Sequence, residues 1–310
     1  MCHILGSVDV KIAACVGVKD EVELIRACVG HLRRIGVDHI IVSDAYSTDG
    51  TADVLAELAQ GGTLEVVMFD DQSADPSVED SATRDIFRRA RNVGADWLLF
   101  CDADEFPMPR TGQLRDVKAL SRSDALIISR FNVPLLQDGI ALNLETEIDY
   151  DATLLYAPNE DRTATQARLR QDNDAPWIAS IPGPKLMART DRISSTAEAH
   201  HNILAEDGAA VTTEVPNDLF LAHVPFSTES RFYKKVENIR SVLTANGENW
   251  GPDSAWHWRR WIDNIEKRGG ISGELARNIV TDQELSDLRR LGIVKSAVEV
   301  WEYLAVSHPR

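Results

Sequence analysis

The chain has 310 residues, enough to bury a full hydrophobic core as one large domain or as one domain with an appendage. Asp and Glu total 49 against 33 Lys and Arg, which gives a formal net charge of -16. A surface of this sign repels the phosphate backbone of a nucleic acid, so the composition argues against nucleic-acid binding.

Cysteine spacing and the N-terminal residues indicate the compartment. The four cysteines contain no C-x-x-C pair, and reduced thiols are their default state. No run approaches the ~20 apolar residues of a membrane span, and the first three residues lack the basic region of a secretory signal. We expect a cytoplasmic protein with no transmembrane segment, which could associate peripherally with a membrane through an acceptor.

Strands and helices alternate over the first 130 residues. Apolar runs predict strands at residues 8–18, 39–43, 64–69, 97–100 and 124–130, with helices between them that include residues 81–91. This alternation predicts an α/β fold with a mainly parallel, twisted sheet and right-handed crossovers. Ligands of such sheets bind beyond the carboxyl ends of the strands, where Val18, Asp44 and Asp102 lie.

The pattern changes beyond residue 135. Residues 159–174 are polar enough to be either a mobile loop over the site or an ordinary surface excursion. Residues 228–241 regain helical spacing, and the remainder reads as helical pieces. We therefore expect a main domain over residues 1–227 and a helical C-terminal region over residues 228–310 that packs on it.

An aromatic stretch, residues 256–261, lies in this C-terminal region. It could form a sugar-stacking platform or an interfacial anchor. However, Trp258, Trp261 and Ile265 fit the spacing of one helix face, which favours packing against the main domain.

The acidic loop after residue 100 is the most informative motif. An apolar run, residues 97–100, leads into Asp102 and Asp104, which are spaced i, i+2. Residues at this spacing in an extended segment point the same way, so both carboxylates can converge on one hard cation that prefers oxygen ligands. The alternative role of such a triplet is to cap and solubilise a loop. In the first case the loop predicts Mn²⁺ or Mg²⁺ at a phosphate-handling site.

Three motifs in this order resemble the family 2-like glycosyltransferases of GT-A fold. They are the stretch Lys19 to Glu21, the stretch Ile40 to Thr51, and the acidic loop, which continues to Phe106 as in the subgroup with a D-x-D-E-F motif. The resemblance covers about the first 130 residues and extends more weakly to about residue 240. Asp20 departs from the pattern, because the family usually has Asn there.

The resemblance implies a GT-A-like, Rossmann-like domain that transfers a sugar from a UDP- or GDP-type nucleotide-diphosphate sugar to the hydroxyl of a saccharide or lipid-linked acceptor. Such a hexosyltransferase would be metal-dependent and inverting, and would act in surface polysaccharide or glycolipid synthesis. The residues that would contact the nucleotide sugar are Val16, Gly17, Glu21, Asp44, Ser47, Arg84, Asp102 and Lys185. The residues that would hold the metal are Asp102, Asp104 and His223.

Each of these residues also has a structural alternative. Asp44 could cap the turn into the next helix, and Glu21 could be a helix N-terminal carboxylate. His223 could be a hydrogen-bonded core histidine, whereas Arg84 and Lys185 could be solvated surface charges.

Transfer to a hydroxyl requires a proton acceptor beside the acceptor oxygen. Glu198, His200 and His201 are the leading candidates, with Asp191 and Asp149 behind them. Glu198 is favoured, because a carboxylate in a partly desolvated cleft can be tuned towards neutral pH.

Functions of other classes stay open. A nucleotidyltransferase shares the nucleotide and the metal, but the stretch Val16 to Lys19 has only one glycine to cradle a triphosphate. A phosphatase of the haloacid dehalogenase type usually has Thr or Val where Phe106 stands. A non-catalytic nucleotide- or carbohydrate-binding protein would keep Asp44 and tolerate loss of the base.

Overall fold

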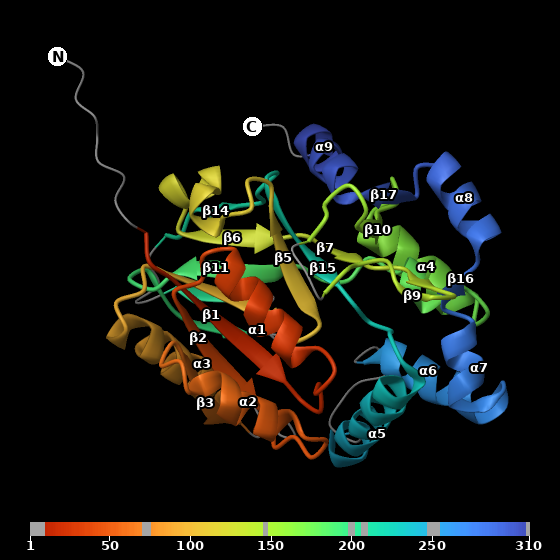
Figure 1. Ribbon diagram of the computed structural model, residues 1–310, viewed down its shortest axis with the longest axis horizontal. Coiled ribbons are helices and arrows are strands. Elements are labelled where there is room, and N and C mark those ends of the chain that lie inside the picture. The colour runs from red at the N-terminus through yellow and green to blue at the C-terminus, as the bar shows by residue number, and fades with distance from the viewer. Residues whose placement is uncertain are drawn as a thin grey trace.

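The fold is taken from a computed structural model of the chain (Figure 1). It describes residues 10–69, 76–144, 148–197, 202–205, 210–246 and 255–307. Within these residues, no helix is long and apolar enough to cross a membrane.

A seven-stranded sheet forms the centre of the molecule. Its strands, in spatial order, are β14 (Thr213–Glu214), β6 (Ala125–Ile128), β11 (Lys185–Arg189), β4 (Trp97–Asp102), β1 (Ile12–Val18), β2 (His39–Asp44) and β3 (Leu64–Met68). Strand β11 is antiparallel to both of its neighbours, whereas the other neighbouring pairs are parallel. The predicted α/β fold with a mainly parallel central sheet is confirmed.

Helices cover both faces of the sheet at its centre, which explains why β1 and nearly all of β4 are apolar. Successive side chains of β1 point to opposite faces: Ile12, Ala14 and Val16 pack in one core cluster with α1 (Ile25–Arg34) and α2 (Thr51–Ala59). The intervening Ala13 and Cys15 pack in another cluster with α3 (Pro76–Asn92). The site is thus built on a rigid layer buried on both sides.

A second, five-stranded sheet was not predicted from the sequence. Its order is β17 (Val294–Ser296), β10 (Leu154–Tyr156), β7 (Arg130–Asn132), β15 (Leu219–His223) and β5 (Glu105–Pro109). Strand β5 begins directly after the Ala103-Asp104 turn that ends β4, so the acidic loop joins the two sheets. Two short hairpins lie outside these sheets. Strand β8 (Leu135–Leu136) pairs with β9 (Gly139–Ile140), whereas β12 (Ile193–Ala197) pairs with β13 (Asn202–Ala205) and packs against α3.

The C-terminal region is helical, as predicted, and lies beside the second sheet in Figure 1. Its helices are α5 (Glu229–Asn246), α6 (Trp256–Lys267), α7 (Gly270–Ala276), α8 (Asp282–Arg290) and α9 (Ala297–Ser307). Two short strands connect it back to the rest of the fold, because β16 (Ile279–Val280) pairs with β8 and β17 pairs with β10.

The aromatic stretch on α6 packs in a hydrophobic cluster. Trp261 is buried and makes ring contacts with Phe226, Phe232 and Trp177, at centroid distances of 5.5, 5.7 and 5.8 Å. Trp258 and Ile262 lie against the same cluster. These contacts are those expected of a packing helix.

Residues 159–174, which we expected to be either a mobile loop or a surface excursion, contain a helix, α4 (Arg162–Gln171). Asp161 caps it by accepting a hydrogen bond from the backbone N–H of Ala164 at 2.7 Å, and Leu169 is buried beneath it. The mobile-loop alternative is wrong. The helix was not recognised because it buries only Thr165 and Leu169, so its hydrophobic pattern is weak.

His31 on α1 gives the fold a predicted sensitivity to acid. Its Nε2 contacts the carbonyl oxygen of Pro107 on β5 at 2.6 Å, and burial lowers the pKa of His31 to about 4. As pH falls below about 6.5, the unfolded chain therefore binds a proton that the folded chain does not, and stability falls until the pH reaches the folded pKa.

We expect His31 to contribute a loss of about 2 kcal/mol in the free energy of unfolding between pH 7 and pH 5. Urea unfolding at the two pH values measures this, and His31→Gln should flatten the dependence by that amount. An unchanged pH dependence in the variant would contradict the assignment.

Candidate functional site

The carboxyl ends of β1, β2 and β4 lie side by side at one edge of the central sheet. In the parallel registers, Val18 pairs with Asp44 and Gly17 pairs with Asp102. The structure therefore brings together the three motifs that the sequence analysis singled out, from positions far apart in the chain.

Gly17 allows β1 and the acidic loop to approach closely. Its carbonyl oxygen accepts a hydrogen bond from the N–H of Ala103 at 2.9 Å. A Cβ atom at Gly17 would lie 3.0 Å from Oδ1 of Asp102, a contact that real Cβ atoms rarely make. A side chain here would displace the Asp102 carboxylate.

The loop after β1 is hydrogen-bonded to the loop after β2. Asp20 has a positive φ of 52°, a backbone conformation in which Asn and Asp are enriched. Its Oδ1 accepts from the N–H of Thr48 at 2.5 Å, and its own N–H donates to Oγ of Ser47 at 2.9 Å. Asp20 can thus fill the backbone position at which the resembling family has Asn.

Asp44 is buried at the end of β2 and shapes the turn that follows. Its Oδ1 accepts hydrogen bonds from the N–H and the hydroxyl of Ser47, at 2.9 and 2.7 Å. This is the turn role that the sequence analysis set beside nucleoside binding. Among the described residues, none donates a hydrogen bond to the second carboxylate oxygen of Asp44.

Asp102 pairs with Lys185, which reaches the rim from β11. The Lys185 ammonium donates to Oδ2 of Asp102 at 2.9 Å and lies 3.9 Å from Glu105. The surrounding protein opposes ionisation of Asp102, but the Lys185 charge outweighs this effect and holds the pKa of Asp102 below its ordinary value. Lys185 is thus buried at the site and is not a solvated surface charge.

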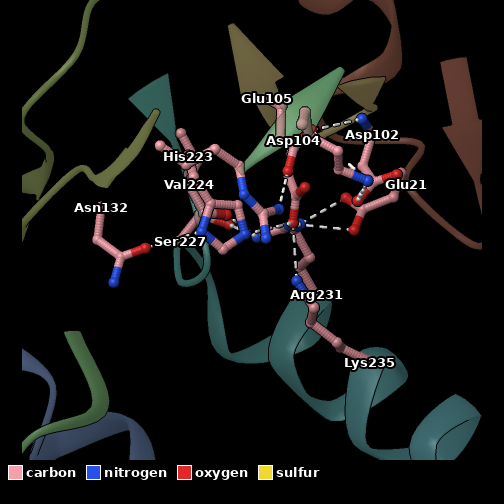
Figure 2. Close-up of polar contacts among 12 residues, drawn as sticks. Glu21, Asp102, Asp104, Glu105, Asn132, His223, Val224, Ser227, Arg231 and Lys235 are labelled. Atoms are coloured by element: carbon pink, nitrogen blue, oxygen red, sulfur yellow. Dashed lines mark hydrogen bonds and ion pairs between the residues drawn. The ribbon is translucent and has the colours of Figure 1, made fainter. Parts of the chain in front are cut away.

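Asp104 is buried and accepts hydrogen bonds from two cations of α5 (Figure 2). Its Oδ2 lies 2.9 Å from Nη2 of Arg231 and 2.7 Å from Nζ of Lys235. Burial alone would raise the pKa of Asp104, but these cations lower it strongly, so the carboxylate is ionised.

Arg231 also binds Glu21, so it connects α5 to the loop after β1. Its Nε and Nη2 donate to the two carboxylate oxygens of Glu21 at 2.5 and 2.9 Å, and its Nη1 donates to the carbonyl oxygen of Val224 at 3.0 Å. Burial raises the pKa of Glu21 despite the Arg231 charge. Glu21 therefore acts as the anchor of Arg231 in this structure.

Arg231 and Lys235 were not predicted from the sequence. They are spaced i, i+4 on one helix, so both reach the same carboxylate, but they follow Asp104 by 127 and 131 residues. The only local signal was this spacing of two cations just after the Val224-Pro225 segment.

Asp104, Glu105 and His223 form the group of described residues whose ligand atoms lie close enough to share a metal ion, within 4.8 Å of one another. Two of the three predicted metal ligands are in this group, and Glu105 takes the place of Asp102. Glu105 is buried, accepts a hydrogen bond from Arg130, and accepts another from the N–H of Asp102 at 2.9 Å.

His223 has the orientation that a metal ligand requires. Its Nδ1 lies 2.7 Å from Oδ1 of Asn132, and its Nε2 faces Oδ2 of Asp104 at 3.7 Å. The Nδ1 contact fixes the ring, as partners of metal-binding histidines do. Burial lowers the pKa of His223 to about 3, so the imidazole is neutral near pH 7.

Other predicted residues lie apart from this cluster. Arg84 on α3 donates to Asp80 and to Ser194, at 2.9 and 3.2 Å. Asp191 pairs with Arg189, which lies beside Trp97 at the opposite end of β4 from Asp102.

The remaining candidates for the base occupy two places. Asp149 accepts hydrogen bonds from the backbone of Asp151 and Ala152, which is a turn role. Glu198, His200 and His201 lie outside the described residues.

The comparisons with known proteins identify the family. The model of glycosyltransferase family 92 matches residues 10–240, a range that includes Asp104, Glu105 and His223. The chain belongs to glycosyltransferase family 92. The prediction of a glycosyltransferase is confirmed at this level, while the family 2-like subgroup stays a prediction. Among curated proteins, none matches this family 92 chain.

Solved structures similar to this family 92 chain include S. aureus TarS, residues 1–349, at 13% identity and a TM-score of 0.36, covering 91% of this chain and 92% of that one. Another is glucosyl-3-phosphoglycerate synthase from Mycobacterium tuberculosis in complex with Mn²⁺, UDP and glucosyl-3-phosphoglycerate, at 14% identity and a TM-score of 0.33. The match covers 79% of this chain and 82% of the synthase chain.

Proposed function

We propose that the chain is a metal-dependent glycosyltransferase that transfers a sugar from a nucleotide-diphosphate sugar to an acceptor hydroxyl. The observation that carries this proposal is the cluster of Asp104, Glu105 and His223 at the carboxyl edge of the sheet, in a chain of family 92. The two carboxylates suit Mn²⁺ or Mg²⁺, and the neutral imidazole suits a transition metal such as Mn²⁺ better than it suits Mg²⁺.

These ligand atoms fit a divalent cation, which Asp104, Glu105 and His223 would hold. A bound cation would supply Lewis-acid stabilisation of the negative charge on the departing diphosphate. Lys185, which is held by Asp102 beside this group, can donate to the donor phosphates, and Asp102 can contact the bound cation.

The nucleoside would bind at the adjoining end of β1 and β2. We assign Val16 and Gly17 to the wall beside the base, and Asp44 to hydrogen bonds through its second carboxylate oxygen. Ser47 then holds Asp44 in position. UDP and GDP are the proposed donor types.

The acceptor hydroxyl would lose its proton to a base while the anomeric bond to the diphosphate breaks. Glu198, with His200 and His201 beside it in the sequence, is our proposed base, and the reaction would invert the configuration of the sugar. A saccharide or lipid-linked acceptor, a cytoplasmic location and peripheral membrane association are parts of the same proposal.

Donor hydrolysis and thermal stability together test this function. A ligand that binds only the folded state at a hundred times its Kd stabilises it by about 2.7 kcal/mol. UDP or GDP should therefore raise the melting temperature, and more so with Mn²⁺. The protein should also hydrolyse the matching nucleotide sugar faster than a control without enzyme. Binding without hydrolysis or transfer would favour a non-catalytic nucleotide-binding protein instead.

A further inference from the structure

The two cations on Asp104 differ in how firmly they are held. The Arg231 side chain is 3% exposed and also binds Glu21 and Val224. The Lys235 side chain is 25% exposed, and its hydrogen bond to Asp104 is the only one it makes to a described residue. Lys235 can therefore leave Asp104 without breaking another hydrogen bond in this part of the structure.

Lys235 also lies where a metal ion would compete with it. Its ammonium binds Oδ2 of Asp104, the same oxygen that faces Nε2 of His223 at 3.7 Å (Figure 2). A cation held by Asp104 and His223 would approach this oxygen. Because like charges repel strongly at such short range, the ammonium and a divalent ion cannot both bind there favourably.

The ion-paired side chains around Asp104 carry equal numbers of positive and negative charges. The carboxylates Glu21, Asp102, Asp104 and Glu105 are paired with the cations Arg130, Lys185, Arg231 and Lys235. A divalent ion that binds alone would leave this buried cluster with excess positive charge. A diphosphate that binds with the ion would restore the balance and would offer the ammonium new oxygen partners.

We propose that Lys235 is a built-in competitor for the metal at Asp104, and that it moves to the donor diphosphate when metal and nucleotide bind together. This inference rests on the proposed function. A lysine suits the task, because its ammonium is a compact charge with three donors on a flexible stem. Arg231 donates to the same oxygen of Asp104, but its two hydrogen bonds to Glu21 hold it in place. The metal should then bind weakly alone and tightly with the nucleotide, and the coupling should be reciprocal.

Calorimetric titration of Mn²⁺, with and without UDP, tests the proposal. In the wild type, UDP should lower the Kd for Mn²⁺ markedly. Lys235→Met should lower the Kd for Mn²⁺ alone by roughly ten- to a hundredfold, since a charged hydrogen bond no longer competes. The factor by which UDP improves Mn²⁺ binding should shrink at least as much.

Two further variants control for charge and folding. Lys234→Met makes the same change at the neighbouring position of α5, where Lys234 has no hydrogen bond or ion pair to a described residue, and it should behave as the wild type. Lys235→Arg keeps the competing charge and should keep weak Mn²⁺ binding. Thermal unfolding of each variant checks that it is folded.

The outcomes separate this inference from the proposed function. If Lys235→Met binds Mn²⁺ alone as weakly as the wild type, or if UDP does not alter Mn²⁺ binding in the wild type, Lys235 is no competitor. The proposed metal-dependent function would still stand. If the wild type binds UDP but no Mn²⁺ under any condition, the metal dependence fails and the inference fails with it.

Discussion

Asp104→Asn is expected to remove the metal-dependent part of nucleotide binding. The substitution keeps the size of the side chain and one acceptor oxygen, but it removes the charge that a divalent ion requires. The additional rise in melting temperature that Mn²⁺ gives with UDP or GDP should disappear. Sugar transfer should fall by roughly 10²–10³-fold, because several kcal/mol of leaving-group stabilisation are lost.

The matched control is Asp287→Asn on α8, which makes the same chemical change at a half-exposed carboxylate that pairs with Arg290. It should leave both the manganese-dependent shift and the transfer rate at wild-type values. Equal manganese-dependent shifts in Asp104→Asn and in the wild type would sink the metal assignment. The melting temperature of Asp104→Asn without metal should be measured as well, because Arg231 and Lys235 lose a charged partner and the fold itself can lose stability.

The sequence was most informative where an apolar strand is followed directly by a polar motif of the candidate site. The strands β1, β2 and β4 are apolar because helices cover both faces of the sheet, so their runs were recognisable without a structure. A polar motif after each run then had to lie at the carboxyl edge, since parallel strands end together. Asp44, Asp102 and Asp104 accordingly lie at one rim of the sheet, as predicted.

It was least informative where contacts depend on distant segments. Strands such as β10 and β7 are only three residues long, too short to show a period in hydrophobicity, so the second sheet was missed. Arg84 was predicted to contact the nucleotide, and its contacts with Asp80 and Ser194 were not foreseen; its role stays a prediction. Arg231 was overlooked, because its spacing from Lys235 was the only local signal and does not distinguish a buried arginine from a solvated one.

Arg231→Met is expected to destabilise the fold by about 3–5 kcal/mol, which is the usual cost of removing one partner from a buried ion pair. Glu21 would lose both of its bonds to the guanidinium and would remain buried without a compensating charge. Urea unfolding measures the effect. Arg240→Met, at an exposed position of the same helix, should change stability by less than about 0.5 kcal/mol.

The pH dependence of this loss tests its cause. Burial already raises the pKa of Glu21 in the folded protein, and removal of Arg231 should raise it further. Because the pKa of Glu21 is higher in the folded than in the unfolded protein, the folded state holds the proton more tightly. This stabilises the fold fully below the unfolded pKa, and the stabilisation is lost as pH rises through the folded pKa. The difference in the free energy of unfolding between Arg231→Met and the wild type should therefore be largest near pH 7 and should shrink as pH falls towards 4.

Adding Glu21→Gln to Arg231→Met should recover part of the lost stability at pH 7, because the unpaired charge is gone. A difference that stayed constant with pH, and a double variant no more stable than Arg231→Met, would show that Arg231 acts through packing and not through its pairing with Glu21.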